Sequence, residues 1–246
     1  MTEITAVVLA GGFGTRIRHL LGDLPKPMAP VLGRPFLEWV VRHLAGQGIR
    51  KVILSTGYRA EIVEEHFRGQ PVENVDTSCV PETEPLGTAG GFLNAVRTQG
   101  QAPQAWLVSN GDSLVFADLA PLVGALDDPG ISGAILGLRM ADASRYGTII
   151  QDAAGHLVEF AEKKTGVGVI NAGVYLFRAT LLDAFPGRSP LSFEKDVFPD
   201  WIRRGVRLQV CATDAPFLDI GTPESLPQAE AFIRQNRDRF GPAEAA

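Results

Sequence analysis

Short apolar runs alternate with amphipathic stretches along most of the chain, and this alternation limits the fold more than any other feature. Residues 4–9 and 51–55 have the composition of buried strands, whereas residues 35–47 carry apolar side chains at helical spacing. Further elements are predicted as helices over 60–67, 193–204 and 223–240 and as strands over 106–109, 131–138 and 207–212. We therefore expect an α/β fold with a Rossmann-like, mostly parallel mixed sheet flanked by helices.

The pattern changes between residues 146 and 177, where short strands are separated by glycine-containing turns at 152–155 and 166–168. This predicts a small antiparallel flap beside the main sheet. A chain of 246 residues suits one domain that buries its own core. No hexapeptide β-helix repeat is present, so we expect a single domain over 1–246 without a C-terminal β-helix domain.

Composition narrows the functional class. A hydrophobic fraction of 45% and a charged fraction of 21% argue against disorder, and the formal charge of −5 argues against a non-specific nucleic-acid binder. Cys79, Cys211 and the four scattered histidines give neither a disulfide framework nor the spacing of a zinc site. The first residues lead directly into a predicted strand and no apolar run reaches membrane-spanning length, so we expect no leader, a cytoplasmic protein and no membrane partner.

A glycine-rich loop follows the first predicted strand directly, with the sequence LAGGFGTR over 9–16. Glycines let backbone N–H groups approach a phosphate closely, and Arg16 adds a fork of donors. Ile17 breaks the G-x-G-x-x-G pattern, and no Gly-Lys-Ser/Thr closes a Walker loop. Ten residues beyond Arg16, two prolines flank Lys26 and restrict its backbone, which presents the ammonium at a lower entropic cost. These residues predict a phosphate-binding site.

The GGFGTR loop and the PKP motif together resemble the signature of the sugar-1-phosphate nucleotidylyltransferases. Further matches follow in the family's order along nearly the whole chain, namely ETEPLGTAGG at 82–91, NGD at 110–112, YG at 146–147, EK at 162–163, NAG at 171–173 and DIGTPE at 219–224. Lys164 departs from the family, which commonly has proline there. The resemblance implies a nucleotidyltransferase domain with a nucleotide-binding half over about 1–140 and a sugar-phosphate-binding half over about 141–240.

The resemblance also implies a reaction, in which a sugar 1-phosphate oxygen attacks the α-phosphorus of a nucleoside triphosphate and releases pyrophosphate. Asp112 and Asp219 would then hold Mg²⁺, which prefers one or two carboxylates together with phosphates and waters. Both follow apolar runs, which would place them at the carboxyl edge of the sheet, where α/β proteins bind ligands. Three basic side chains are the expected catalytic residues. Arg16 would bind the β- and γ-phosphates, Lys26 would bind the α-phosphate region, and Lys163 would bind the phosphate of the sugar.

Two groups of binding residues follow from the same resemblance. The expected nucleotide-binding residues are Leu9, Ala10, Gly11, Gly12, Gly14, Thr15, Arg16, Lys26, Glu82, Pro85, Gly87, Thr88, Asn110, Gly111 and Asp112. The expected sugar-phosphate-binding residues are Tyr146, Gly147, Glu162, Lys163, Asn171, Gly173, Glu194 and Lys195. The segment 192–196 would close the sugar pocket.

Glu82 suggests which base is bound. Many relatives that take uridine or thymidine triphosphate carry glutamine at this position. A carboxylate only accepts hydrogen bonds, so it suits the paired N1–H and N2–H donors of guanine and would be repelled by the carbonyls of uracil. Glu84 is an alternative reader of the base. We therefore expect GTP as the nucleotide partner.

Segments 24–30, 33–36 and 192–196 resemble most closely the branch that acts on D-glycero-α-D-manno-heptose 1-phosphate, which would make GDP-heptose for a cell-surface polysaccharide. Four alternatives remain: a mannose 1-phosphate guanylyltransferase, a uridylyl- or thymidylyltransferase, a catalytically inactive sugar-nucleotide-binding regulatory subunit, and a glycosyltransferase. Asn110 stands where the first aspartate of a glycosyltransferase D-x-D motif would be. Retention of all the charged site residues argues against an inactive protein, and the sequence leaves a homodimer possible.

Overall fold

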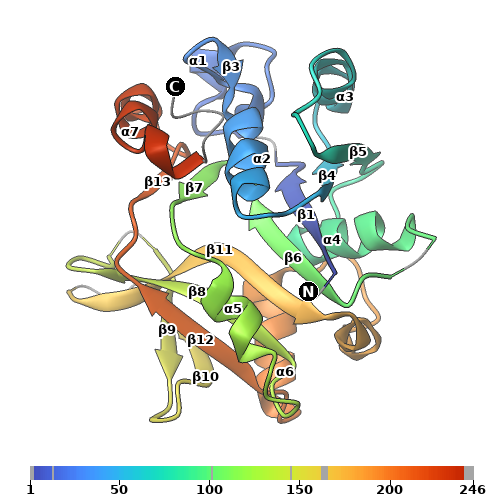
Figure 1. The fold of residues 1–246 in the computed structure, drawn as a ribbon, viewed down its shortest axis with the longest axis vertical. Coiled ribbons are helices and arrows are strands. Elements are labelled where there is room, and N and C mark those ends of the chain that lie inside the picture. Colours follow the sequence, from blue (N-terminus) through green and yellow to red (C-terminus); the bar gives the residue numbers. More distant parts are fainter. Residues whose placement is uncertain (1–2, 13, 101, 145, 162–165, 241–246) are drawn as a thin grey trace.

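The computed structural model describes residues 3–12, 14–100, 102–144, 146–161 and 166–240. Within these residues a nine-stranded mixed sheet crosses the molecule in the order β10-β9-β11-β6-β1-β4-β5, with β8 beside β11 and β12 beside β8 (Figure 1). The strands are β1 (Ile4–Ala10), β4 (Lys51–Thr56), β5 (Asp76–Pro81), β6 (Ala105–Asn110), β8 (Gly133–Met140), β9 (Thr148–Gln151), β10 (Leu157–Ala161), β11 (Gly168–Arg178) and β12 (Leu208–Thr213).

In the parallel half of the sheet, the inner strands β1, β4 and β6 are mostly apolar and buried, whereas the edge strand β5 is partly polar. β1 runs parallel to both β4 and β6, and β5 runs parallel to β4. Val8 and Leu54 pack on the face covered by α2 (Phe36–Gly46) and α3 (Ala60–Gly69), whereas Val7 and Ile53 pack on the face covered by α4 (Thr88–Arg97). Because helices cover both faces, both sets of alternating side chains must be apolar.

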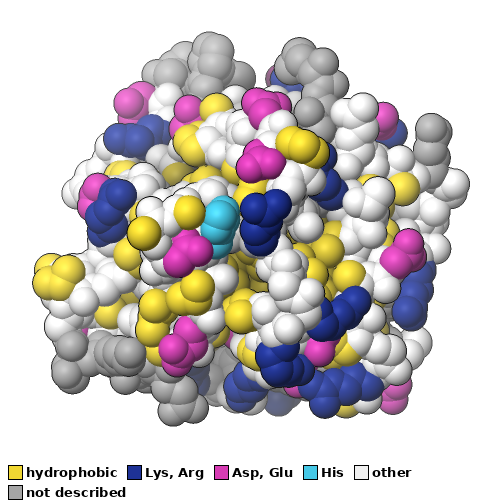
Figure 2. Space-filling model, turned by 90° about the horizontal axis from the view of Figure 1, so that it is seen from below, with side chains coloured by type: hydrophobic (Ala, Val, Ile, Leu, Met, Phe, Trp, Pro, Cys, Tyr) yellow, Lys and Arg dark blue, Asp and Glu magenta, His cyan; other side chains and the backbone are white. Residues whose placement is uncertain are grey.

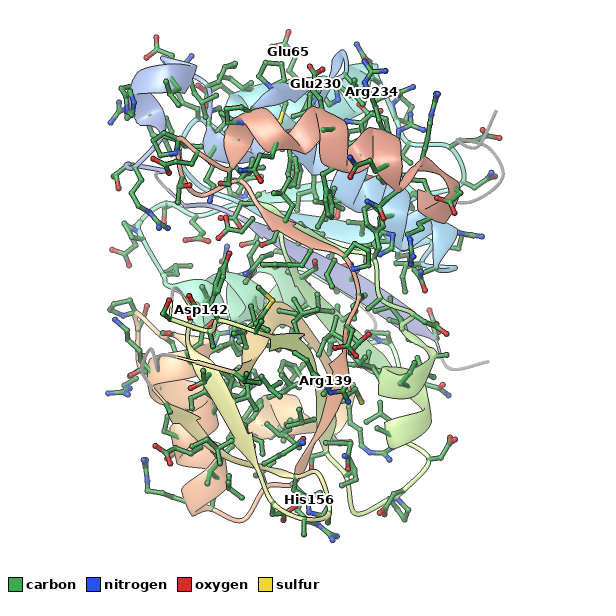
Figure 3. The ribbon with its side chains drawn as sticks, turned by 90° about the vertical axis from the view of Figure 1, so that its left-hand side faces the viewer. Glu65, Arg139, Asp142, His156, Glu230 and Arg234 are labelled. Atoms are coloured by element: carbon green, nitrogen blue, oxygen red, sulfur yellow. The ribbon has the colours of Figure 1, made fainter. Side chains whose placement is uncertain are left out.

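The other half of the sheet is mostly antiparallel. β11 runs antiparallel to β6 and β8, and β9 and β10 form the predicted antiparallel flap, with His156 at its tip (Figure 3). Behind it lies an aromatic cluster of fully buried rings, made by Tyr175, Phe177, Phe193, Phe198 and Trp201. The last three come from the predicted helix over 193–204, which forms a π-helical turn (Phe193–Val197) followed by α6 (Phe198–Arg203).

The predicted helix over 223–240 is wrong as a single element. Thr222 and Ser225 hydrogen-bond to each other through side chains and backbone and close a turn there. Pro227 has no N–H with which to continue a helix from residue 223. The chain instead forms a 3₁₀ turn (Leu226–Gln228), the helix α7 (Ala229–Gln235) and a second 3₁₀ turn (Arg237–Phe240). α7 docks through buried Ala229 and Ile233, as its spacing predicts.

Shorter elements connect the larger ones. They are α1 (Arg18–Leu21), a 3₁₀ turn (Lys26–Met28), β2 (Pro30–Val31), β3 (Arg34–Pro35), β7 (Ser113–Val115), α5 (Ala120–Ala125), a 3₁₀ turn (Ala179–Ala184) and β13 (Phe217–Asp219). None of the described helices is long and apolar enough to cross a membrane. The face shown in Figure 2 carries acidic and basic side chains that lie among one another and among apolar ones.

Burial of His43 predicts acid-sensitive stability. Its ring lies on α2, edge-on to Phe116 and Phe240, and burial lowers the pKa of the imidazole to about 4. In the unfolded chain the same histidine titrates near pH 6.5, so the unfolded state binds more protons between pH 6.5 and 4. The free energy of unfolding should therefore fall by up to about 3 kcal/mol as the pH drops through this range.

Urea unfolding at several pH values measures this effect. His43→Phe keeps an aromatic ring in the cluster and removes the titrating group, so its stability should depend less on pH over the same range. Equal pH slopes for the two proteins would show that His43 does not cause the acid sensitivity.

Candidate active site

The glycine-rich loop leaves the carboxyl end of β1 and packs tightly against its neighbours. A Cβ on Gly57 would lie 2.5 Å from the Gly11 carbonyl oxygen, so this close approach of two chain segments requires glycine. Gly14 has a φ of +57°, and a Cβ there would lie 2.7 Å from the Lys26 Cβ. The loop therefore rests directly on the stem of Lys26.

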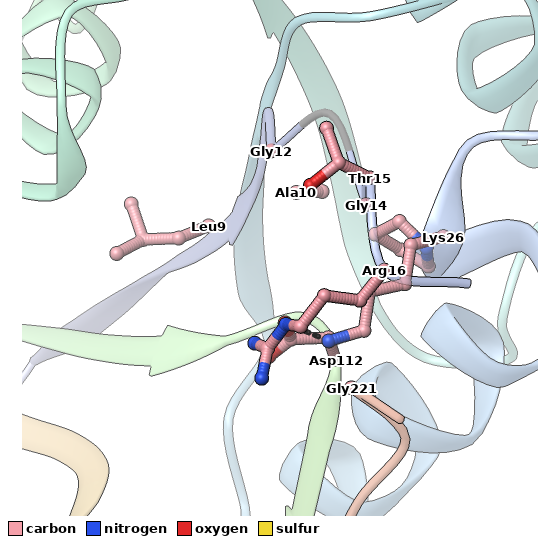
Figure 4. Close-up of a pocket in the computed structure, with 10 residues that line it drawn as sticks. Leu9, Ala10, Gly12, Gly14, Thr15, Arg16, Lys26, Asp112 and Gly221 are labelled. Atoms are coloured by element: carbon pink, nitrogen blue, oxygen red, sulfur yellow. Dashed lines mark hydrogen bonds and ion pairs between the residues drawn. The ribbon is translucent and has the colours of Figure 1, made fainter. Parts of the chain in front are cut away.

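Lys26 is buried, with a relative exposure of 7%, and so are the prolines on either side of it. Its Nζ lies 2.6 Å from Asp112 Oδ2 and 3.5 Å from Asp219 Oδ1. Figure 4 shows Lys26 and Arg16 extending toward Asp112. The structure thus brings the two residues expected to bind the triphosphate, Arg16 and Lys26, close to the aspartates expected to bind the metal.

A small second sheet places the two aspartates side by side. Asp112 follows β6 and leads into β7, and β13 pairs antiparallel with β7 so that Asp219 lies opposite Ser113. The backbone N–H of Ile220 donates to the Asp112 carbonyl at 3.0 Å, and Gly221 donates to Asp219 Oδ1 at 2.5 Å. The first bond fixes the backbone of Asp112 and the second fixes the carboxylate of Asp219, both at the carboxyl end of the parallel strands.

Two adjoining cavities open at this edge of the sheet and share Leu9, Gly12 and Asp112. One, of about 170 Å³, is lined by the glycine-rich loop, Arg16 and Lys26. The other, of about 320 Å³, extends past Glu82 to Thr88 and Asn110. Every residue expected to bind the nucleotide lines one of these cavities except Gly111, which lies beneath them and donates its N–H to the Leu9 carbonyl.

The Glu82 carboxylate is held in place by hydrogen bonds from two other residues of the protein. Its Oε1 accepts from Ser55 Oγ at 3.2 Å, and its Oε2 accepts from the backbone N–H of Leu86 at 3.1 Å. A Cβ on Gly11 would lie 2.8 Å from Oε1, so the carboxylate packs against the glycine-rich loop. Each carboxylate oxygen has a second lone pair available for a ligand. Glu84 is exposed and lines a neighbouring cavity of about 200 Å³ together with Tyr58.

The expected sugar-side residues gather around β11 and the π-helical turn. Asn171 Nδ2 donates to the Tyr175 hydroxyl at 2.7 Å, and that hydroxyl donates to Glu194 Oε1 at 3.1 Å. Gly173 has a φ of +70°, and any Cβ there would overlap the Asn110 amide, so β11 closely approaches the nucleotide side. Gly147 accepts from the Asn171 N–H at 3.2 Å.

Two of the expected sugar-side residues stand apart from this group, and two more lie outside the described residues. Tyr146 packs against Phe217 on the strand that carries Asp219, with ring centroids 5.8 Å apart. Lys195 is exposed and donates its backbone N–H to Ser192 Oγ. Glu162 and Lys163 fall in the range 162–165, which the structure does not describe.

Tyr175 and Gly221 are site residues that the sequence reasoning did not single out. Burial, with a further contribution from the Glu194 charge, raises the pKa of the Tyr175 hydroxyl well above its usual value, so the group stays protonated and donates. The side chain of Tyr175 lies in the apolar core, and sequence patterning alone classes it as a core residue. Gly221 lines the smaller cavity and follows Asp219, so the DIGTPE motif could have identified it.

The donor set at Asp112 and Asp219 fits Mg²⁺. A single cationic group, the Lys26 ammonium, contacts both carboxylates, so one small cation can lie between them. Among the residues that the structure describes, no group of three His, Cys, Asp or Glu side chains is arranged to hold a metal alone. Two carboxylates with the other positions left to phosphates and waters is the arrangement that Mg²⁺ prefers.

A family model described as nucleotidyl transferase matches residues 5–236. This chain belongs to the nucleotidyltransferase family. The predicted family and the predicted enzyme class are both confirmed by this match.

Named relatives of this nucleotidyltransferase are guanylyltransferases. A D-glycero-α-D-manno-heptose 1-phosphate guanylyltransferase from Campylobacter jejuni is 34% identical over 89% of this chain and 95% of its own length. A mannose-1-phosphate guanylyltransferase from Mycobacterium tuberculosis is also 34% identical, over 94% of this chain and 65% of its own length.

Solved structures confirm the predicted fold class. The crystal structure of HddC from Yersinia pseudotuberculosis matches with a TM-score of 0.81 and 33% identity over 93% of this chain and 98% of that one. A second HddC structure, complexed with GMP-PN, matches with a TM-score of 0.80. The nucleotidyltransferase fold is thus shared along nearly the full length of both proteins.

Proposed function

We propose that this nucleotidyltransferase transfers GMP from GTP to D-glycero-α-D-manno-heptose 1-phosphate, giving GDP-heptose and pyrophosphate. The observation that carries the proposal is the meeting of Lys26, Asp112 and Asp219 beside cavities lined by the glycine-rich loop. A nucleotidyl transfer concentrates negative charge on phosphoryl oxygens, and the site supplies backbone N–H groups, cations and carboxylates that can hold a metal. The named relatives and the HddC complex with GMP-PN support guanine as the base.

The charged residues would divide the work of positioning the triphosphate. Arg16 binds the β- and γ-phosphates of the leaving pyrophosphate, and Lys26 moves its ammonium from the carboxylates to the α-phosphate when the triphosphate enters. Asp112 and Asp219 would hold Mg²⁺, which when bound would supply positive charge to the phosphate oxygens. In-line attack requires little acid–base chemistry, so positioning and charge account for most of the rate.

The sugar 1-phosphate would bind between β11 and the π-helical turn. Asn171, Glu162 and Glu194 contact the sugar hydroxyls, Gly147 and Gly173 give its ring room, and Lys163 holds its phosphate. All of these residues come from the second half of the chain, about 141–240, and the triphosphate residues come mainly from 1–140.

Mannose 1-phosphate is the second candidate acceptor because the M. tuberculosis mannose-1-phosphate guanylyltransferase is as similar as the C. jejuni heptose enzyme. A screen of pyrophosphate release with five triphosphates against a panel of sugar 1-phosphates distinguishes them. We expect the highest kcat/KM with GTP and the heptose 1-phosphate. A preference for uridine or thymidine triphosphate would contradict the guanylyl assignment, and a preference for mannose 1-phosphate would replace the acceptor.

A cytoplasmic location and a homodimer stay predictions.

The base assignment predicts discrimination against inosine triphosphate. If Glu82 accepts from both N1–H and N2–H of guanine, inosine triphosphate loses one charge-assisted hydrogen bond because it lacks the 2-amino group. The loss is about 1.5–3 kcal/mol, which lowers kcat/KM roughly 10- to 150-fold relative to GTP.

Glu82→Gln should narrow that difference, because an amide both donates and accepts. Steady-state kinetics with GTP and inosine triphosphate measure it in both proteins. Glu84→Gln is the matched control, and it should keep the discrimination of the wild type. If the wild type uses both triphosphates equally well, or if Glu82→Gln discriminates fully, Glu82 does not read the base.

A further inference from the structure

The turn that begins α4 (residues 86–90) is bonded to a distant segment of the chain. Leu191 donates its backbone N–H to the Leu86 carbonyl at 2.7 Å. The Leu191 carbonyl accepts from the N–H groups of Ala89 and Gly90 at 2.9 and 3.0 Å. Both ends of the turn therefore hydrogen-bond to the backbone of Leu191, so the contact does not depend on the identity of the Leu191 side chain.

Thr88 adds a side-chain bond to the same contact. Its Oγ1 accepts from the backbone N–H of Phe193 at 3.0 Å, and both Phe193 and Leu191 are buried. Gly87 has a φ of +78°, and a Cβ there would lie 2.6 Å from the Leu191 carbonyl oxygen, so only glycine admits this approach. The α4 turn and the 191–194 segment thus form one bonded unit.

Glu194 lies at the far end of this unit, and its carboxylate is fixed in place. Its Oε2 accepts from Ser192 Oγ at 3.0 Å, and its Oε1 accepts from the Tyr175 hydroxyl at 3.1 Å. Asn171 Nδ2 lies 3.5 Å from the same oxygen. A shift of the Phe193 backbone would therefore move Glu194 relative to Tyr175 and Asn171.

Glu82 lies at the near end. Its Oε2 accepts from the Leu86 N–H at 3.1 Å, while the Leu86 carbonyl accepts from Leu191. Leu86 is therefore bonded on one side to the carboxylate assigned to the base and on the other to the sugar-side segment. Pro85, Gly87 and Thr88 line the same cavity as Glu82, so a nucleotide there contacts this turn directly.

We propose that Thr88 is a positioning residue that sets Glu194 for the sugar 1-phosphate, and that through this contact a bound triphosphate raises the affinity for the sugar 1-phosphate. The inference rests on the proposed function, because it takes the Glu82 cavity as the nucleotide side and Glu194 as the sugar side. Ligands that order the same structural unit favour each other's binding, and the effect is reciprocal.

Two variants of Thr88 test the positioning role. Thr88→Val keeps the shape and removes the acceptor for the Phe193 N–H, whereas Thr88→Ser keeps the hydroxyl. With Thr88→Val we expect the KM for heptose 1-phosphate to rise roughly three- to tenfold, the effect of losing one hydrogen bond, and the Kd for GTP measured without the sugar phosphate to change little. Thr88→Ser should behave as the wild type. A raised KM for GTP with an unchanged KM for the sugar phosphate would overturn the proposal and make Thr88 a nucleotide ligand.

Hydrogen exchange of the 191–196 amides tests the coupling without any transfer reaction. We expect GTP alone to increase their protection in the wild type and in Thr88→Ser, and to increase it much less in Thr88→Val. Unchanged protection in the wild type with GTP bound would overturn the coupling. UTP is run in parallel, so protection by UTP together with UTP-dependent transfer would contradict the guanylyl assignment and leave the coupling standing.

Discussion

Asp112→Asn is expected to lower kcat by about a hundredfold or more while leaving the fold intact. The amide has the size of the carboxylate and can still accept from Lys26, but it lacks the charge that holds a divalent cation. Asp112 is only partly exposed and lies 2.6 Å from the Lys26 ammonium, so its charge acts at the phosphates rather than in bulk water. Initial rates at saturating Mg²⁺ and both substrates measure the loss.

Asp219→Asn should reduce kcat in the same way, and the double variant should lose less than the product of the two single losses because both residues act on one metal. Asp214→Asn is a matched control. It lies in the same stretch of chain, is exposed and pairs with Arg139 on the surface, so its kcat should equal that of the wild type. Near-normal turnover of Asp112→Asn would contradict the metal-ligand assignment, and additive losses would contradict a shared metal.

Lys26→Met is expected to destabilise the free protein and to make its stability depend on Mg²⁺. Methionine replaces most of the apolar stem of a side chain that is 8% exposed, but it leaves Asp112 and Asp219 close together without a cation. We expect a loss of about 1–3 kcal/mol, which lowers the Tm of a chain of this size by roughly 2–10 °C. Millimolar Mg²⁺ should restore much of this loss, since an ion that binds only the folded state stabilises it.

Thermal melts with and without Mg²⁺ measure both the loss of stability and its recovery, and they do not depend on activity. The wild type should respond weakly to Mg²⁺ without a triphosphate, because Lys26 already neutralises the carboxylates. Lys51→Met, which removes a surface lysine that pairs with Glu3, serves as the control and should resemble the wild type. If Lys26→Met has the Tm of the wild type and that Tm does not change with Mg²⁺, the aspartate pair is not a cation site.

The inner parallel strands β1, β4 and β6 could be predicted from the sequence because their side chains are buried on both faces and leave apolar runs. The parallel edge strand β5 was not predicted, because its polar side chains leave no such run. The helix α4 was not predicted, because Gly90 and Gly91 in its first half lower its intrinsic helix propensity. It forms because Phe92 and Ala95 pack in the core and Leu191 accepts from its first N–H groups. Such long-range contacts leave no local signal in the chain.

The candidate site likewise contains residues that the sequence predicts and contacts that it does not. The glycine-rich loop, Lys26, Asp112 and Asp219 stand out in the sequence through their motifs and their positions after strands. The pairing of β13 with β7, which brings Asp219 to Asp112, joins short segments that patterning does not connect. Ser55 and Tyr175, which donate to Glu82 and Glu194, lie in segments whose sequence indicates only buried strands.

The central claim, transfer of GMP to a sugar 1-phosphate, is tested most directly by the fate of labelled oxygen. The protein is incubated with GTP, Mg²⁺ and heptose 1-phosphate that carries ¹⁸O in its phosphate, and the products are separated for mass spectrometry. We expect one pyrophosphate for each GDP-heptose, all of the label in the nucleotide sugar and none in pyrophosphate, with no reaction when either substrate is omitted. Pyrophosphate formed without the sugar phosphate, or no labelled nucleotide sugar with any triphosphate and sugar 1-phosphate tried, would contradict the account.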